Sequence, residues 1–435
     1  MDPVTVGILG AIVAFALLLV GMPIAFALMF AGFAGVGWLV GFEAALPMVA
    51  RTVYEVSSYF PYTVIPLFIV MGGFAASSGM TADLYRAFEK WLRYLPGGLG
   101  VATIAACAGF AAVSGSSVAT AATMGTVALP EMKRFNYHPR LATGSVAAGG
   151  TLGFLIPPSI GFIVYGMLTE QSIGKLLVAG ILPGLLLAAA FILIVIAMVK
   201  LDPKLAPARP EPVSRAEKFS SLLAVWEPVG VFVLVMGGIY GGFFTPTEAG
   251  AVGATVLFVI AAVKGRLSRR ALTEALQEAV RISVMVLVLV AGANVFSYFL
   301  ALSTIPIHLA QWAGNLQVSP YLVHTVIVIA YLFLGCFLDA ISMMILTMPV
   351  IFPVILTLGF DPIWFGVIAV LMMEAGLITP PMGLNLFTVA GVAEDVPVET
   401  VSLGVAPFLV AIIAVAALVT VFPSIALVLP AMMGR

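Results

Sequence analysis

The sequence is a succession of apolar segments, each close to the roughly 20 residues that an α-helix needs to cross a lipid bilayer. Only 9% of the 435 residues are charged, against roughly 25% in an average soluble domain. The chain is therefore predicted to be an all-α membrane protein with many spans. Its formal net charge of −1 gives no reason to expect a nucleic acid as a partner. The segments fall near 4–20, 22–41, 61–79, 141–169, 176–199, 221–242, 246–263, 283–302, 363–392 and 402–430.

Two further apolar regions, 98–136 and 320–357, are interrupted in the middle by small and polar residues. The first breaks at Ser114–Ser117 and the second around Gly335–Ser342. Each region could form two ordinary spans. A re-entrant hairpin suits the polar tips better, because irregular backbone at membrane depth is tolerated only inside protein or along a cavity.

Two of the spans, 141–169 and 363–392, contain paired prolines and are predicted to be broken helices. The breaks fall in Gly153–Ser159 and in Gly376–Asn385. Proline has no amide donor, so carbonyls one turn earlier lose their helical partner. Together with hydroxyls they form a hard oxygen ligand set without formal charge, which suits Na⁺. The alternative is a proline-kinked helix packed against small residues.

An internal repeat relates these features. A shift of 223 residues, which is 246 minus 23, places Pro23 on Pro246 and needs no gap up to the second pair of prolines. It also places Ser116 on Asp339, so that one hairpin tip falls on the other. Proline and glycine fix the backbone, so agreement at these residues indicates equivalent structure. The other matched pairs are Thr81 with Thr304, Pro130 with Pro353, Gly153 with Gly376, Pro157 with Pro380 and Pro158 with Pro381.

The distribution of Lys and Arg predicts that the two copies are inverted in the membrane. With the N-terminus outside, nearly all basic residues lie in inner loops. Segment 81–95 is basic, whereas its equivalent 304–318 has no Lys or Arg; 43–58 has one basic residue and 266–281 has four. Inverted repeats of this kind build transporter sites at the bilayer midplane. These four amphipathic segments are expected to lie along the two interfaces, with ordinary loop helices as the alternative.

The repeat defines the expected domain organisation. Residues 1–200 form the first repeat, with hairpin 98–136 and broken helix 141–169. Residues 201–220 are a hydrophilic linker, expected on the cytoplasmic side. Residues 221–435 form the second repeat, with hairpin 320–357 and broken helix 363–392.

Acidic residues inside membrane segments are functional candidates by default. Asp339 is read either as an ion ligand or as a cap on the second helix of its hairpin, and both readings stay open. Glu374 is similar but is expected nearer a helix packing face. Glu248 follows Thr245 and Pro246 in a helix-capping pattern and is expected to be structural.

At this point the chain resembles the large membrane subunit (DctM type) of tripartite ATP-independent periplasmic (TRAP) transporters, over essentially its whole length. The resemblance rests on several motifs together. They are S-G-S-S-V-A-T-A at 114–121, G-x-L-I-P-P-S at 153–159, F-T-P-T-E-A-G at 244–250, F-L-D-A-I-S-M at 337–343 and G-L-I-T-P-P-M-G-L-N at 376–385.

The resemblance implies an ion-transporter superfamily fold that works as an elevator and couples import of an organic acid to a Na⁺ gradient. It implies a small four-span DctQ-type subunit and a periplasmic DctP-type binding protein, in a bacterial or archaeal cytoplasmic (inner) membrane. By similarity, Na⁺ is expected at Ser114, Ser117, Gly149, Gly153 and Pro157, and again at Gly335, Thr379 and Met382. The substrate is expected between the tips, at Ser116, Thr120, Pro158, Ser159, Asp339, Pro381 and Asn385.

Other functions fit the sequence less well. A stand-alone dicarboxylate or anion carrier of the same superfamily is the closest alternative. No P-loop, H-E-x-x-H or G-x-S-x-G motif is present, so neither ATP hydrolysis nor an enzyme activity is expected. A passive channel would not need two inverted polar breaks that face each other.

Overall fold

The computed structural model describes residues 2–207, 214–223, 225–315 and 318–433. Over these ranges the chain is helical and contains no β-strand. Part of the predicted linker, 208–213, lies outside the described residues. The all-α prediction is confirmed.

The first half runs from α1 to η2. Its helices are α1 (Pro3–Leu19), α2 (Ile24–Val40), α3 (Phe42–Ser58), η1 (Phe60–Thr63), α4 (Val64–Ser77), α5 (Met80–Leu92), α6 (Gly98–Ser114), α7 (Ser117–Arg134), α8 (Pro139–Leu155), α9 (Ile160–Thr169), α10 (Ile173–Ala179), α11 (Ile181–Leu201) and η2 (Pro203–Leu205).

The second half runs from α12 to α22. Its helices are α12 (Arg215–Leu222), α13 (Trp226–Tyr240), α14 (Pro246–Val263), α15 (Arg269–Leu302), α16 (Ile305–Asn315), α17 (Pro320–Gly335), α18 (Ala340–Thr357), α19 (Pro362–Leu377), α20 (Leu384–Ala393), α21 (Val398–Val421) and α22 (Ser424–Met432).

The helix boundaries of the two halves follow the 223-residue shift. Adding 223 to the bounds of α7, 117–134, gives 340–357, the bounds of α18. The same shift takes the first residue of α1 to that of α13, and α9 to within one residue of α20. Hairpin α6–α7 therefore corresponds to α17–α18, and broken helix α8–α9 to α19–α20. Both predicted hairpins and both predicted breaks are present.

One pair of equivalent segments differs from the prediction. In the first half α3 ends at Ser58 and a short turn, η1, leads into α4. In the second half the corresponding residues form the single 34-residue helix α15, so 266–281 contains no separate interfacial helix. Pro61 lies in η1 and has no amide donor to continue the helix. The equivalent residue in the second half is Val284, which keeps its amide donor inside α15.

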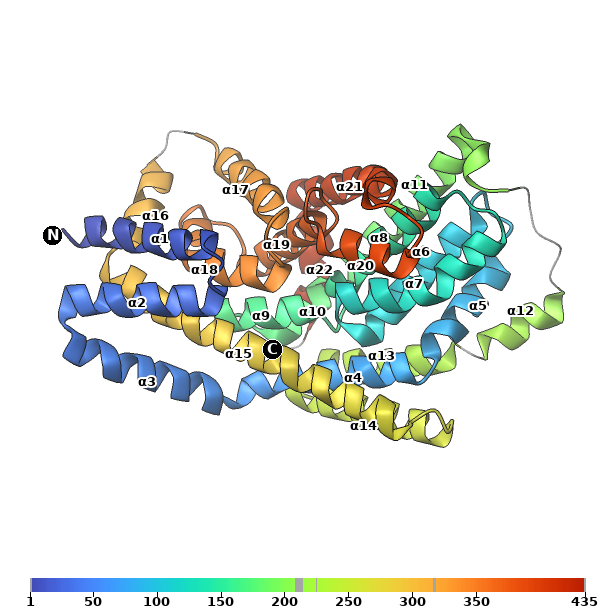
Figure 1. The fold of residues 1–435 in the computed structure, drawn as a ribbon, viewed down its shortest axis with the longest axis horizontal. Coiled ribbons are helices and arrows are strands. Elements are labelled where there is room, and N and C mark those ends of the chain that lie inside the picture. The colour runs from blue at the N-terminus through green and yellow to red at the C-terminus, as the bar shows by residue number, and fades with distance from the viewer. Residues whose placement is uncertain (1, 208–213, 224, 316–317, 434–435) are drawn as a thin grey trace.

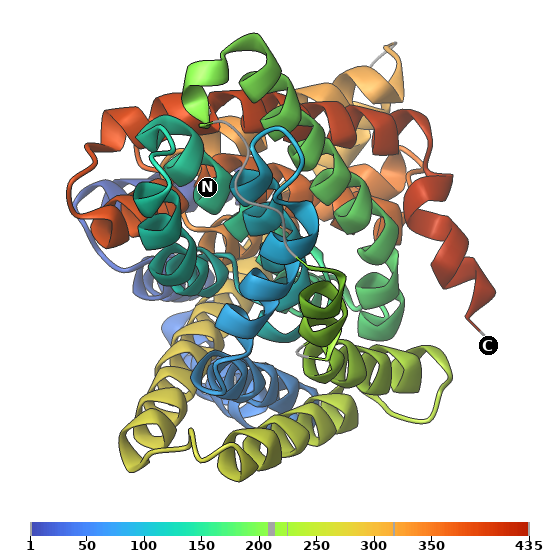
Figure 2. The ribbon, with the colours of Figure 1, turned by 90° about the vertical axis from the view of Figure 1, so that its right-hand side faces the viewer.

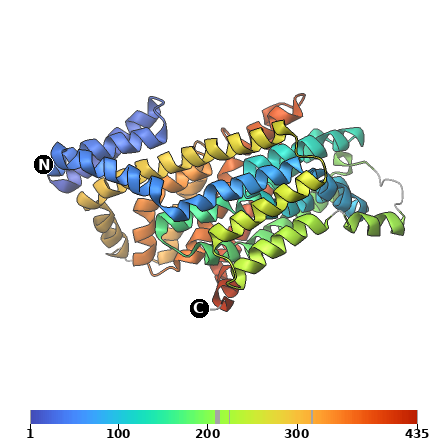
Figure 3. The ribbon, with the colours of Figure 1, turned by 90° about the horizontal axis from the view of Figure 1, so that it is seen from below.

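The helices form an elongated bundle (Figure 1). Helices α1 to α3 and α16 lie at one end, and α12 lies at the other. Helices α4, α13, α14 and α15 run side by side (Figure 3), and α14 and α15 both pack against α4. Seen along the long axis (Figure 2), α13, α14 and α15 lie on one side of the molecule, and α4 and α13 contact α6 of the first hairpin while α15 contacts α18 of the second. The hairpins thus lie against a scaffold of long helices.

Six helices of the described chain are long and apolar enough to cross a membrane, and a seventh span results if α8 and α9 count as one. The axes of α8 and α9 are bent by 41° at the break between them. Other apolar helices, including α1, α2, α6 and α17, are shorter, at 10 to 17 residues. The fold is that of a multi-pass membrane protein in which several helices end inside the bundle.

A cluster of charges joins α5 to the scaffold. Lys264 Nζ lies 2.7 Å from Glu227 Oε2 on α13 and 3.5 Å from Asp83 Oδ2 on α5. Arg266 Nη1 also lies 3.5 Å from Asp83 and donates a 2.7 Å hydrogen bond to the carbonyl of Ser78. Helix α5, which packs against α6, is thereby connected to the turn between α14 and α15.

Candidate functional site

The tip of the first hairpin is a tight turn between α6 and α7. Helix α6 ends at Ser114, and Gly115 adopts a φ of +69°, a left-handed conformation that glycine accepts without steric cost. Ser116 then caps α7, its hydroxyl oxygen accepting a hydrogen bond of 3.4 Å from the amide of Ala119. The cap begins a new helix at once, so the hairpin stays compact.

This tip lies directly against the first broken helix. The amide of Ile160 donates to the carbonyl of Gly115 at 3.3 Å. A methyl group added to Gly153 would lie 2.5 Å from both the carbonyl oxygen of Ser116 and the hydroxyl oxygen of Thr120. The structure therefore brings together Ser116, Thr120 and Gly153, three of the residues predicted from the sequence.

The first break is closed off from solvent. Helix α8 ends at Leu155, and the bond between Pro157 and Pro158 is cis. Ser159 caps α9 and its hydroxyl donates to the carbonyl of Phe154, so this predicted substrate residue already has hydrogen-bond partners. Every residue from 151 to 160 is buried.

Two other predicted sodium residues pack close to neighbouring helices. A methyl group on Gly149 would meet the sulfur of Cys107 at 2.6 Å, so α8 approaches α6 closely there. The carbonyl of Ser114 faces Gly72 of α4, and a methyl group on that glycine would lie 2.8 Å from the carbonyl oxygen. Both contacts place small residues where helices come nearest.

The second tip and break repeat this arrangement with one difference. A methyl group on Gly376 would lie 2.5 Å from the Cα of Gly335, so α17 and α19 touch backbone to backbone. The hydroxyl of Thr379 donates to the carbonyl of Ala375 at 2.6 Å, and the Pro380–Pro381 bond is cis. Unlike the first break, this one is open: Pro380 and Pro381 are exposed and Met382 is 58% exposed.

Asp339 acts as a helix cap in this structure. Its carboxyl oxygen Oδ1 accepts a 3.0 Å hydrogen bond from the amide of Ser342, in the first turn of α18. Ser116 occupies the equivalent position and caps α7 in the same way. Of the two readings that the sequence left open, the geometry matches the cap.

Two buried polar side chains connect one repeat to the other. The hydroxyl of Ser117, on α7, lies 2.8 and 2.7 Å from the two carboxyl oxygens of Glu374, on α19, and both side chains are buried. Asn385, on α20, donates to the carbonyl of Ala147 on α8 at 3.4 Å, and its own carbonyl oxygen has no partner. From the sequence, Glu374 was considered similar to Asp339 but was expected nearer a helix packing face, and it was not among the predicted site residues. Its intramembrane carboxyl was the one signal that pointed to it.

Comparison with known proteins assigns the family. Residues 11–425 match the family described as "Tripartite ATP-independent periplasmic transporter, DctM component". The chain belongs to this DctM family. It is 36% identical to the C4-dicarboxylate TRAP transporter large permease protein DctM of Pseudomonas aeruginosa, over 88% of this chain and 90% of the relative. It is 33% identical to the sialic acid TRAP transporter large permease protein SiaM of Vibrio cholerae, over 95% and 96%.

A solved structure supports the fold of this DctM protein. The YdaH transporter of Alcanivorax borkumensis superimposes with a TM-score of 0.65 at 17% identity, covering 89% of this chain and 90% of that one. The two proteins share their overall fold, and this chain contains the two hairpins and two broken helices that the sequence predicts. The predicted family and fold class are thus confirmed.

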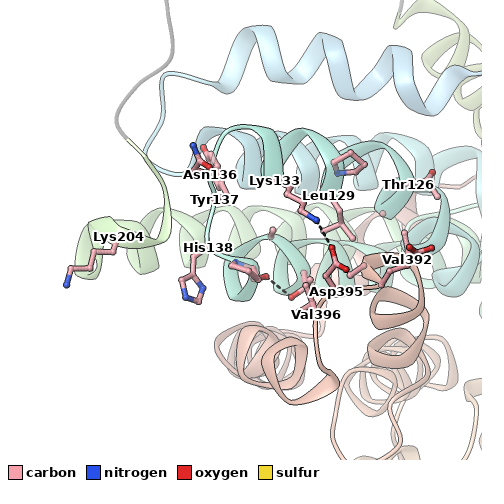
Figure 4. Close-up of a pocket in the computed structure, with 17 residues that line it drawn as sticks. Thr126, Leu129, Lys133, Asn136, Tyr137, His138, Lys204, Val392, Asp395 and Val396 are labelled. Carbon is pink, nitrogen blue, oxygen red and sulfur yellow. Dashed lines mark hydrogen bonds and ion pairs between the residues drawn. The ribbon is translucent and has the colours of Figure 1, made fainter.

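The DctM chain also has a cavity of about 850 Å³ at the base of the first hairpin (Figure 4). Its lining comes from the end of α7, the start of α8 and the loop after α20. Lys133 and Asp395 point toward each other across it, with Nζ 2.6 Å from Oδ2. This cavity contains none of the predicted site residues; those on α7 and α8 lie nearer the opposite ends of these two helices.

Asp395 provides a test of this contact between repeats. Its hydrogen bond with Lys133 lowers the pKa of the carboxyl from 3.8. A carboxyl whose pKa is lower in the folded state stabilises that state above the unfolded value and loses the effect as pH falls through the folded value. Asp395→Asn should therefore slightly lower the thermal midpoint at pH 7. The difference from the parent protein should disappear as pH falls below 3.8; a constant difference would contradict the assignment.

Asp339 can be tested as a cap by two substitutions. Asp339→Ala removes the acceptor for the Ser342 amide and should cost about 1 kcal/mol of stability. Asp339→Asn keeps an oxygen acceptor at the same place and should retain both stability and substrate uptake. The measurements are the thermal midpoint and uptake by reconstituted protein. Loss of uptake in Asp339→Asn with a normal midpoint would instead favour a role in ion or substrate binding.

Proposed function

We propose that this protein is the permease subunit of a sodium-coupled TRAP transporter that imports an organic acid. The observation that carries the proposal is the pair of hairpin tips packed against proline-broken helices, with Ser116, Thr120 and Gly153 in contact at the first. The class of substrate follows from the relatives, whose names refer to C4-dicarboxylates and sialic acid. The proposed membrane is the cytoplasmic (inner) membrane.

Sodium and an anion both fit the chemistry of the tips. The segments 114–117, 153–159, 335–342 and 376–385 contain hydroxyls and freed carbonyls but no Lys or Arg. Hard oxygen ligands suit Na⁺. The N-termini of α7, α9, α18 and α20 begin at the tips and breaks, and their amide groups and dipoles favour an anion. We propose that Na⁺ binds first and orders the tips, and that the carboxylate then binds between them.

The proposed transport step is of elevator type. The hairpins and broken helices move as one body against the scaffold that contains α4, α13, α14 and α15. A small DctQ-type subunit stabilises the scaffold and a periplasmic DctP-type protein delivers the substrate. The exposed second break and the buried first break are consistent with a site that opens toward one side at a time.

Uptake into proteoliposomes that contain both membrane subunits tests this proposal. The binding protein is added outside, and a C4-dicarboxylate and sialic acid are the first substrates tried. With an inward Na⁺ gradient, uptake should exceed the uptake measured with K⁺ in place of Na⁺. Equal uptake with K⁺ would refute sodium coupling. Uptake that does not need the binding protein would favour the stand-alone carrier.

A further inference from the structure

The contact between Ser117 and Glu374 places a carboxyl group inside the protein next to the first tip. Glu374 is fully buried, and its two oxygens lie 2.8 and 2.7 Å from the Ser117 hydroxyl. Among the described residues no Lys, Arg or His forms an ion pair with it. Ser117 is the first residue of α7, so the carboxyl lies at the positive end of that helix dipole. A single hydroxyl and one dipole leave this group short of partners for a buried charge.

A second observation at the same place is a buried hydroxyl oxygen that has no hydrogen-bond partner. Thr120 lies one turn after Ser117 on the same face of α7. Its hydroxyl oxygen is buried and has no hydrogen-bond partner. Both this hydroxyl oxygen and the carbonyl oxygen of Ser116 face Gly153 of α8, where each would lie 2.5 Å from an added methyl group. A buried, unpaired hydroxyl next to a carbonyl, one turn from the serine that contacts the carboxyl, is a set of hard oxygen atoms that suits Na⁺.

The second repeat contains no equivalent of this carboxyl. Under the 223-residue shift, Ser117 corresponds to Ala340 and Glu374 to Thr151. The hydroxyl of Thr151 donates to the carbonyl of Ala148 in its own helix at 2.6 Å. The two tips therefore have different carboxyl groups: Glu374 contacts the first tip, and Asp339 belongs to the second, where it caps α18. The uncharged ligand set predicted from the sequence did not include Glu374.

We propose that Glu374 is a carboxyl ligand of the first sodium site and that Na⁺ binding beside it prepares the site for the anionic substrate. This inference rests on the proposed sodium-coupled function. A carboxyl with so few partners is costly to ionise inside the protein. Na⁺ beside it supplies the missing opposite charge, the pair is then neutral, and the helix N-termini favour the substrate. Glu374 thus connects the ion site of one repeat to a helix of the other.

Thermal unfolding of the purified complex tests the proposal with Na⁺ alone as the probe. A ligand that binds only the folded state raises the midpoint as its concentration rises. NaCl is therefore titrated against KCl at constant total salt. Glu374→Gln keeps the size and one acceptor oxygen for the Ser117 hydroxyl but removes the ionisable carboxyl. We expect the Na⁺ concentration for half the stabilisation to rise at least about tenfold in this variant.

Two further variants make the result decisive. Ser117→Ala should also raise that concentration, because it removes the hydroxyl that holds the carboxyl. Glu227→Gln is the matched control: it removes another buried carboxylate, whose partner is Lys264. It should lower the midpoint without changing the Na⁺ dependence. Direct binding of radioactive sodium provides an independent readout for any variant that unfolds too early.

The possible outcomes separate this inference from the proposed function. If Glu374→Gln responds to Na⁺ like the parent protein, the assignment of Glu374 is wrong while sodium coupling stands. If the parent protein shows no response to Na⁺ in either assay, sodium coupling itself is refuted. If the Glu227→Gln control shifts the Na⁺ dependence as much as Glu374→Gln does, the effect is a general loss of stability and the assignment fails.

Discussion

Gly376→Ala is expected to lower substrate uptake about 100-fold, because a displacement of about 1 Å at a binding site has consequences of that size. A methyl group there would lie 2.5 Å from the Cα of Gly335 and 2.9 Å from its carbonyl carbon. Both atoms belong to backbone, so no side chain can rotate away. Helices α17 and α19 must separate, and the second tip moves away from its broken helix. The measurement is uptake by proteoliposomes with equal amounts of inserted protein.

The control for this substitution lies on the same broken helix. Gly391, on α20, has no atom within 4 Å of an added methyl group. Gly391→Ala should retain uptake close to that of the parent protein, and it should fold at least as well because alanine has a higher helix propensity than glycine. Gly153→Ala should behave like Gly376→Ala, since it would meet the Ser116 carbonyl and the Thr120 hydroxyl. Normal uptake in both tip variants would contradict the role assigned to these close contacts.

The breaks and tips could be predicted from the sequence because their causes are local. Paired prolines at 157–158 and 380–381 end α8 and α19 wherever those helices lie. Ser116 and Asp339 each precede a helix and supply the oxygen that its first turn needs. The internal repeat then predicted which segments of the first half correspond to which segments of the second half. It also supported the assignment of α6–α7 and α17–α18 as hairpins rather than as pairs of spans.

The contacts between repeats could not be predicted in this way, because they depend on how the helices pack. Nothing in the sequence relates Ser117 to Glu374, 257 positions away. Asn385 was expected to face the substrate, yet its amide donates to Ala147 inside the protein. The division into domains at 1–200, 201–220 and 221–435 and the ion and substrate roles of the predicted residues remain predictions. They concern membrane placement and ligands, which the polypeptide geometry alone does not fix.

Lys264→Met is expected to lower the free energy of unfolding by about 3 kcal/mol, since removing one partner of a buried ion pair leaves the other charge uncompensated. The side chain of Glu227 is 6% exposed and that of Asp83 is 17% exposed, and Lys264 contacts both. The thermal midpoint of the protein in detergent measures the loss. Arg51→Met is the control: the pair of Arg51 with Glu55 is 80% and 57% exposed, so its loss should leave the thermal midpoint close to that of the parent protein.

The double variant Lys264→Met, Glu227→Gln separates the cost of an unpaired charge from the value of the pair itself. If the unpaired carboxylate causes the loss, neutralising Glu227 should recover most of the midpoint. A double variant that is less stable than Lys264→Met would show instead that each side chain contributes by packing. Helix α5 should stay attached in both variants, because Arg266 still contacts Asp83 and the carbonyl of Ser78. Uptake at temperatures well below the midpoint should therefore be retained, which assigns this cluster to the stability of the scaffold and not to the movement of the hairpins.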